Sequence, residues 1–96
     1  MRVITRKRLV EFGTDHPDAR QPLMDWFTLA SKGKFASFAE LRGTFAAADH
    51  VGKFTVFNIG GNKYRLIAAI HYNRGIMYIR HVLTHAEYDL GKWKED

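Results

Sequence analysis

The sequence predicts an α+β fold in a single domain covering residues 1–96. Three observations lead to this prediction: apolar patterns of helical spacing in the first half, β-branched and aromatic runs in the second half, and glycine-containing turns between those runs. Hydrophobic residues make up 46% of the chain and charged residues 26%, as in an ordinary globular protein. A chain of 96 residues has room for one hydrophobic core.

The N-terminal third predicts one strand and two helices. The strand is "RVIT" at residues 2–5, and the first helix follows in "RKRLVEFGTDH" at residues 6–16. The second helix runs from Pro17 to about residue 31. Pro22 is expected to kink it or delay its regular start, and Gly33 is expected to close it in a left-handed conformation.

Two capping boxes predict the starts of two further helices. In "SFAE", Ser37 precedes a short helix over residues 38–45, and in "THAE", Thr84 precedes a last helix that runs to about Trp93. The segment "AAADHVGK", which follows the helix over residues 38–45 and precedes the first β-rich run, is interpreted as a loop. The capping boxes therefore place one helix before the sheet and one at its end.

Three strands follow the loop, in "KFTVFNI", "KYRLIAAIHY" and "IMYIRHVL", joined by turns at "GGN" and "NRG". With the N-terminal strand they predict a mostly antiparallel sheet built on a three-strand meander. Two or three N-terminal helices should cover one face of it. The last helix is short and lies at the C-terminus.

Alternation of side chains places Arg65 and Lys63 on one face of the middle strand, opposite a set that suits the core. In the last strand the apolar set comprises Met77, Ile79, His81 and Leu83. Arg80 points the other way. If the apolar faces coincide, Arg65 and Arg80 lie together on an open face next to Lys63.

These cations and the last helix supply groups suited to chemistry on phosphates. Guanidinium groups bind phosphate through paired donors, although a solvated sheet face explains them equally well. His85 and Tyr88 are one helical turn apart. They suit proton transfer and orientation of a reacting group, or else they are a surface histidine and a core aromatic residue.

The formal charge of +5 makes nucleic acid a candidate partner. Solubility alone or an acidic protein partner would explain the same charge. The chain has no cysteine, and His81 and His85 straddle a strand-to-helix turn without a third ligand, so we expect no metal and no cofactor. No run is long enough for a membrane span or a signal peptide, so we expect a cytoplasmic protein.

The segments "VFNIGGNKYRLIAAIHY" and "MYIRHVLTHAEYDLGKW" resemble the HigB family of bacterial type II toxins, relatives of the RelE-type mRNA interferases. The resemblance implies a RelE-like fold and an endoribonuclease that cuts mRNA, in many members on the ribosome. It also implies a HigA-type antitoxin as partner. The chain would then be one RelE/HigB-like toxin domain.

Carried over by motif, the resemblance implies that the arginine of "NKYR" is Arg65, that of "YIR" is Arg80, and the pair in "THAEY" is His85 and Tyr88. Lys63 and Lys92 are plausible additional phosphate-binding residues. The cleavage expected is metal-independent, with the RNA 2′-hydroxyl as nucleophile and His85 as the first choice of base.

Two other classes of protein fit the same residues. One is a non-catalytic RNA- or DNA-binding module that uses the basic face, and the other is an interaction protein for an acidic partner. The antitoxin contact is also open. It lies either on the first two helices, through Arg6, Lys7, Arg8 and Arg20, or directly over Arg65 and His85.

Overall fold

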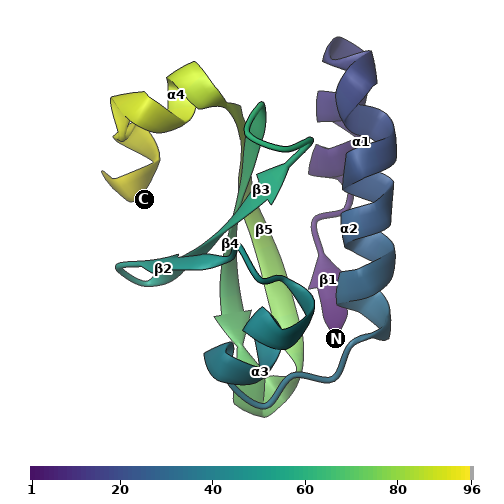
Figure 1. The fold of residues 1–96 in the computed structure, drawn as a ribbon, viewed down its shortest axis with the longest axis vertical. Helices are drawn as coiled ribbons and strands as arrows, with labels where there is room; N and C mark the ends of the chain where they lie inside the picture. Colours follow the sequence, from purple (N-terminus) through teal and green to yellow (C-terminus); the bar gives the residue numbers. More distant parts are fainter. Residues whose placement is uncertain (96) are drawn as a thin grey trace.

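The computed structural model describes residues 1–95 and has the α+β architecture that the sequence predicts (Figure 1). The helices are α1 (Lys7–Asp15), α2 (Arg20–Lys32), α3 (Phe38–Thr44) and α4 (His85–Leu90). The strands are β1 (Arg2–Ile4), β2 (Asp49–Val51), β3 (Phe54–Ile59), β4 (Tyr64–His71) and β5 (Ile76–Thr84). Short 3₁₀ helices cover Pro17–Ala19, Tyr72–Arg74 and Lys92–Glu95. None of the described helices has the length and apolar character needed to cross a membrane.

The strands form one sheet in the order β1-β5-β4-β3-β2. The predicted meander of β3, β4 and β5 is confirmed, with each strand antiparallel to the next, and β1 lies parallel to β5 with Val3 beside Met77. The segment predicted as a loop before β3 instead contains β2, which pairs antiparallel with β3. Asp49 and His50 of β2 are exposed, so no apolar alternation marks this strand in the sequence. Its pairing with β3 defines it.

The helices α1 and α2 lie along one side of the sheet and α4 lies on the other side (Figure 1). The main core fills the space between α1, α2 and the sheet. Leu23 and Trp26 of α2 pack there with Leu66 of β4 and Met77 of β5, all of them buried. Burial of these large side chains is the main source of stability available to a chain of this size.

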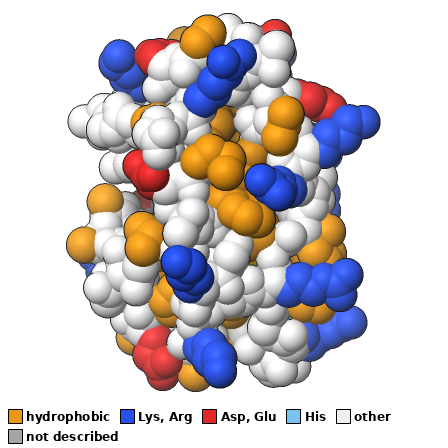
Figure 2. All heavy atoms as spheres, turned by 90° about the vertical axis from the view of Figure 1, so that its right-hand side faces the viewer, with side chains coloured by type: hydrophobic (Ala, Val, Ile, Leu, Met, Phe, Trp, Pro, Cys, Tyr) orange, Lys and Arg blue, Asp and Glu red, His pale blue; other side chains and the backbone are white. Residues whose placement is uncertain are grey.

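The outer side of α1 and α2 leaves hydrophobic side chains in solvent. Val10, Met24 and Leu29 are 59%, 39% and 49% exposed. Figure 2 faces this side and shows hydrophobic side chains gathered in its middle with Lys and Arg side chains around them. A groove of about 320 Å³ between the two helices is lined by Leu9, Val10, Gly13, Thr14, Arg20, Leu23 and Met24.

The ends of α2 confirm one expectation and correct another. A 3₁₀ turn over Pro17–Ala19 precedes the regular helix, so the delayed start is confirmed, and Pro22 sits in the first turn, where a missing N–H does no harm. Gly33 is extended, with φ −74° and ψ 152°, so the predicted left-handed cap is wrong. A Cβ at this position would overlap the Phe35 ring, which would have to move to admit a larger residue.

Both predicted capping interactions at helix starts are present. The Ser37 side chain accepts a hydrogen bond from the Glu40 N–H at 3.3 Å. Thr84 and Glu87 form the full reciprocal pair, with Thr84 N–H donating to Glu87 Oε1 at 2.9 Å and Glu87 N–H donating to Thr84 Oγ1 at 3.2 Å. The helix α4 ends earlier than predicted, at Leu90, because Gly91 turns the chain with a φ of +73°.

The face of the sheet away from α1 and α2 is not open along its whole length. A second cluster of buried residues covers part of it and consists of Phe54, Val56, Ile67 and Trp93. Trp93 belongs to the last 3₁₀ helix, which folds back onto the sheet after α4. The predicted open face is therefore partly closed by the C-terminal segment.

A register shift in the β4–β5 pair changes which side chains share a face. Ile67 pairs with His81 and Ala68 pairs with Ile79, so Arg80 is an extra residue between them. Ile79 packs in the main core, whereas Leu83 packs against the second cluster on the other face. The expectation that one apolar set runs along the whole of β5 is wrong, because a bulge interrupts the alternation.

Candidate functional site

Two of the predicted site residues, Arg65 of β4 and Tyr88 of α4, are in contact. The guanidinium carbon of Arg65 lies 5.4 Å from the centre of the Tyr88 ring, within the range of a cation–π interaction. Nη1 of Arg65 also donates hydrogen bonds of 3.1 Å to the carbonyl oxygens of Asn62 and Tyr64. With only 9% of its surface exposed, Arg65 is held in a defined position at the edge of the second cluster.

Tyr88 is sandwiched between this cation and Trp93. The Tyr88 and Trp93 rings are stacked, with centroids 5.2 Å apart and planes inclined by 14°, and Trp93 Nε1 donates a 3.0 Å hydrogen bond to the Tyr88 carbonyl oxygen. Tyr88 is consequently half-buried. This burial arises because Trp93 returns to cover the Tyr88 ring.

His85 is exposed at the first turn of α4 and is paired with an acidic residue. Its Nδ1 lies 3.0 Å from Oδ2 of Asp89, one turn further along the helix. When Nδ1 carries the proton donated to Asp89, Nε2 is left with a lone pair that faces away from this carboxylate. The backbone N–H of His85 donates to the Lys63 carbonyl oxygen at 3.1 Å, which joins the start of α4 to the start of β4.

Arg80 is not the cross-strand neighbour of Arg65. Arg65 pairs with Leu83 across the β4–β5 ladder, and Arg80 is the exposed extra residue of the bulge, further from the α4 end of β5. Arg80 is thus three residues along β5 from Leu83, the cross-strand neighbour of Arg65, and the bulge separates the two arginines along the strands. Bulges change the direction of side chains and recur beside functional sites. Arg80 is exposed on β5 and is accessible to a phosphate.

Lys63 points to the helical side of the molecule. Its Nζ lies 3.3 Å from Oδ2 of Asp18, and the Tyr64 hydroxyl donates to the other oxygen of the same carboxylate at 2.7 Å. The hydrogen bond from Tyr64 lowers the pKa of Asp18 and raises the pKa of Tyr64. The expected position of Lys63 beside Arg65 is wrong, since Asp18 draws it toward the helices.

Lys92 follows α4 and lines a cavity together with residues from the end of β5. This α4 cavity has a volume of about 380 Å³ and is lined by His81, Leu83, Glu87, Leu90, Lys92 and Trp93. It shares Trp93 with the stack under Arg65. The candidate site therefore consists of a fixed cation and ring pair, an exposed histidine–carboxylate pair, and a neighbouring cavity.

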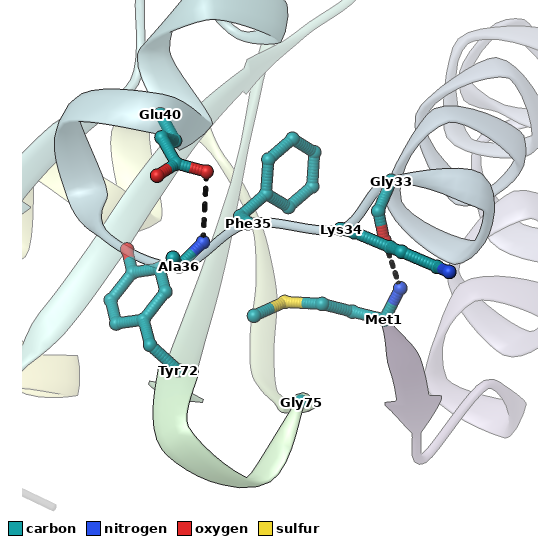
Figure 3. A pocket seen from close by; sticks show the side chains of 8 residues that line it. All are labelled: Met1, Gly33, Lys34, Phe35, Ala36, Glu40, Tyr72 and Gly75. Carbon is teal, nitrogen blue, oxygen red and sulfur yellow. Dashed lines mark hydrogen bonds between the residues drawn. The ribbon is translucent and has the colours of Figure 1, made fainter.

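A different cavity lies at the opposite end of β5, beside Gly75 (Figure 3). It has a volume of about 320 Å³, and Figure 3 shows Met1, Phe35 and Tyr72 around it. None of the six predicted site residues lines it. Arg65, His85, Tyr88 and Lys92 lie instead around α4, at the other end of the sheet.

Two residues of the site were not singled out from the sequence. Asp89 had a usable signal, because it stands four residues after His85 in a predicted helix and so lies on the same side. Trp93 had none beyond its aromatic character. Its contact with Tyr88 depends on the turn at Gly91, which reverses the chain after α4.

The family comparison matches residues 19–91 to the HigB toxin family, described as a RelE-like toxic component of a toxin–antitoxin system. The matched range covers three-quarters of the chain. The chain belongs to the HigB toxin family. The range includes Arg65, Arg80, His85 and Tyr88, and ends just before Lys92.

Similar members of the HigB family span nearly the whole chain. A protein of Escherichia coli K12 named mRNA interferase toxin HigB is 34% identical over 92 residues, which are 93% of this chain and 88% of the relative. An mRNA interferase HigB of Shigella flexneri has the same identity and coverage. Another from Escherichia coli O6:H1 is 27% identical over 93% of this chain and 89% of its own length.

Proposed function

We propose that this chain is the toxin of a type II toxin–antitoxin system and acts as an endoribonuclease that cleaves mRNA. The single observation that carries the proposal is the match over 93% of the chain to a relative named mRNA interferase toxin HigB. The arrangement at the α4 end supports it independently. His85 lies there with the cations Arg65 and Lys92, and Arg80 is exposed further along β5. A proton-transfer group and nearby positive charge are what cleavage of a phosphodiester requires.

The reaction proposed uses the RNA 2′-hydroxyl as nucleophile. Nε2 of His85 accepts its proton, and O2′ forms a bond to the adjacent phosphorus while the bond from phosphorus to O5′ breaks. The leaving O5′ takes a proton, so the products are a 2′,3′-cyclic phosphate and a 5′-hydroxyl end. Asp89 acts as a positioning residue, because its hydrogen bond at Nδ1 leaves Nε2 as the proton acceptor.

The cations have different roles in this proposal. Arg80 and Lys92 are exposed and bind the phosphate oxygens, whose negative charge grows in the transition state. Arg65 is nearly buried. It contributes its fixed positive charge at the edge of the site and holds Tyr88, whose hydroxyl orients the phosphate or donates to the leaving oxygen.

The ribosome is proposed as the place of cleavage. The exposed His85 and Arg80 do not lie in a deep cleft that would align a flexible RNA strand unaided. Orientation of the reacting groups supplies much of the rate in such a reaction. A ribosome holding the mRNA would provide this orientation, and the enzyme would supply the proton-transfer groups and the charge.

A HigA-type antitoxin is proposed to bind the groove between α1 and α2. The groove exposes Val10 and Met24, and apolar area removed from water is a general source of affinity. Acidic residues alternate with the cations on these helices, since Lys7 pairs with Glu11 at 3.7 Å. Apolar contact is therefore the main attraction in this proposal, and charge on the partner has a smaller part.

Induced expression in bacteria with mRNA ends mapped before and after induction tests the proposed function. The wild type is expected to stop growth and to create new 5′-hydroxyl ends within transcripts. His85→Ala is expected to lose both effects, whereas Arg74→Ala, an exposed change in the 3₁₀ turn at the far end of β5, should keep them. Normal growth and unchanged transcripts in cells that contain the folded wild type would refute the proposal.

A further inference from the structure

The α4 cavity has a feature that the proposed reaction does not use. Leu90 at its mouth is 70% exposed, more than Val10, Met24 or Leu29. An exposed leucine alone needs no explanation. This one borders a cavity of about 380 Å³, which is within the range of about 300–1,000 Å³ usual for small-molecule sites.

The lining of the cavity combines apolar walls with polar groups of both signs. Leu83, Leu90 and Trp93 supply apolar surface, while Glu87 and Lys92 bring a carboxylate and an ammonium group. One Glu87 oxygen accepts the Thr84 N–H at 2.9 Å. A carboxylate has about four acceptor positions, so Glu87 can still accept hydrogen bonds from a ligand.

The cavity lies on the same short helix as the proposed base. His85 is at the first position of α4 and Leu90 at the last, which separates them by about 7.5 Å along the helix axis. At 3.6 residues per turn, Glu87 and Leu90 lie on another side of α4 from His85, and the cavity adjoins the site through Trp93, which lines it and stacks on Tyr88. A nucleotide next to the one that meets His85 and Tyr88 would have its base near this cavity. Unpaired RNA bases are commonly recognised in this way, by contact with apolar surface and by hydrogen bonds to their edges.

We propose that the α4 cavity binds one unpaired nucleobase of the mRNA beside the cleavage point and prefers a base with an exocyclic amino group. This rests on the proposed ribonuclease function and adds a specificity site to it. Glu87 accepts from the amino group, which adenine, cytosine and guanine have and uracil lacks. Leu83 and Leu90 contact the ring, while Lys92 binds the adjacent phosphate as proposed above.

Base frequencies around the mapped mRNA ends test this directly. Two variants alter the cavity and keep the helix intact. Glu87→Gln retains an acceptor for the Thr84 N–H but can also donate to uracil O4, and Leu90→Ala removes apolar contact at a 70% exposed position. The matched controls are Glu40→Gln, which changes the corresponding cap residue of α3, and Leu29→Ala, which changes a leucine that is 49% exposed on α2.

In the wild type, uracil should be depleted at one position next to the cut. Glu87→Gln should lower this discrimination by about fivefold or more, Leu90→Ala should flatten the base preference there, and both controls should match the wild type. An unchanged preference in both cavity variants, or a wild type without any preference, would overturn the proposal. The proposal would also be overturned if the cavity variants escaped neutralisation by the antitoxin but kept the wild-type base preference, since the cavity would then hold a protein segment. A wild type that creates no new ends would refute the ribonuclease function itself, which is a distinct result.

Discussion

The Nδ1 atom of His85 lies 3.0 Å from Oδ2 of Asp89, and both side chains are largely exposed at 49% and 61%. The imidazole of His85 can transfer a proton, and the Asp89 carboxylate holds the imidazole ring in position. Nothing in the packing of α4 requires it, because neither residue belongs to a buried cluster. The pair lies in the helix that directly follows β5, and this position is consistent with a role in the reaction.

Asp89→Asn should lower cleavage without unfolding the protein. The expected loss is roughly tenfold, well below the about 10⁴-fold found for the carboxylate of a buried Ser-His-Asp triad, because solvent screens this exposed pair. Asp89→Glu should restore part of the activity, which a purely structural role would not predict. Asp25→Asn is the control, since Asp25 accepts a 2.8 Å hydrogen bond from Gln21 in the same one-turn spacing on α2. Equal mRNA cleavage by Asp89→Asn and the wild type would remove Asp89 from the site.

Tyr88 should show different effects for two substitutions. Tyr88→Phe keeps the stack on Trp93 and is expected to leave the thermal midpoint unchanged while lowering cleavage through loss of the hydroxyl. Tyr88→Ala exposes the second cluster and should lower the free energy of unfolding by roughly 1–2 kcal/mol, about the value for a half-buried aromatic side chain. Thermal melts and mapped mRNA ends measure the two effects separately. A fully active Tyr88→Phe would leave Tyr88 with a packing role only.

Substitution of Arg65 should lower both stability and activity, whereas substitution of Arg80 should lower activity alone. Arg65→Ala removes a nearly buried cation that donates to two carbonyl oxygens, so it should lower the free energy of unfolding by about 2 kcal/mol and also lower cleavage. Arg80→Ala changes an exposed residue and should alter the free energy of unfolding by no more than about 0.5 kcal/mol while lowering cleavage. Denaturant unfolding with the mRNA assay tests both. Arg80→Ala with wild-type activity would place Arg80 outside the phosphate site.

The contact between Lys63, Tyr64 and Asp18 should make stability depend on pH. The pKa of Asp18 is lowered in the folded protein, chiefly by the Tyr64 hydrogen bond. The carboxylate therefore stabilises the fold above its unfolded pKa of 3.8, and this contribution is lost as the pH falls through the lower folded value. Asp18→Asn should melt at a lower temperature than the wild type at pH 7, and the difference should shrink as the pH falls below 3.8. A difference that stays constant with pH would show that the charge is not involved.

Antitoxin binding should depend on the groove between α1 and α2. Val10→Glu with Met24→Glu places two charges where apolar contact is proposed, so neutralisation by a co-expressed antitoxin should fail while the toxin remains active. Ala47→Glu, an exposed change in the loop before β2, is the control. Charge reversal at Arg6, Lys7 and Arg8 should weaken binding less, because Glu11 and Asp15 already interrupt the basic surface. Normal neutralisation of both groups of variants would favour a contact over Arg65 and His85.

Most of the helices, strands and turns follow from interactions between residues that are close in the sequence. The capping boxes at Ser37 and Thr84 and the glycine turns depend on residues a few positions apart, so their structures could be predicted without knowledge of the rest of the fold. The meander could be predicted for the same reason. The family motifs in "NKYR" and "THAEY" also lie within such short segments, which is why Arg65, His85 and Tyr88 could be named from the sequence.

The arrangement of the site was decided by the tertiary structure. The bulge at Arg80 arises from pairing between β4 and β5 and breaks an alternation that either strand alone would suggest. Lys63 turns to Asp18, a residue 45 positions away, and β2 exists through its pairing with β3. Tyr88 is covered because Gly91 brings Trp93 back against it. The sequence by itself determined the elements and the chemical groups, since these depend on neighbours in the chain, whereas their contacts depend on segments that meet only after the whole chain has folded.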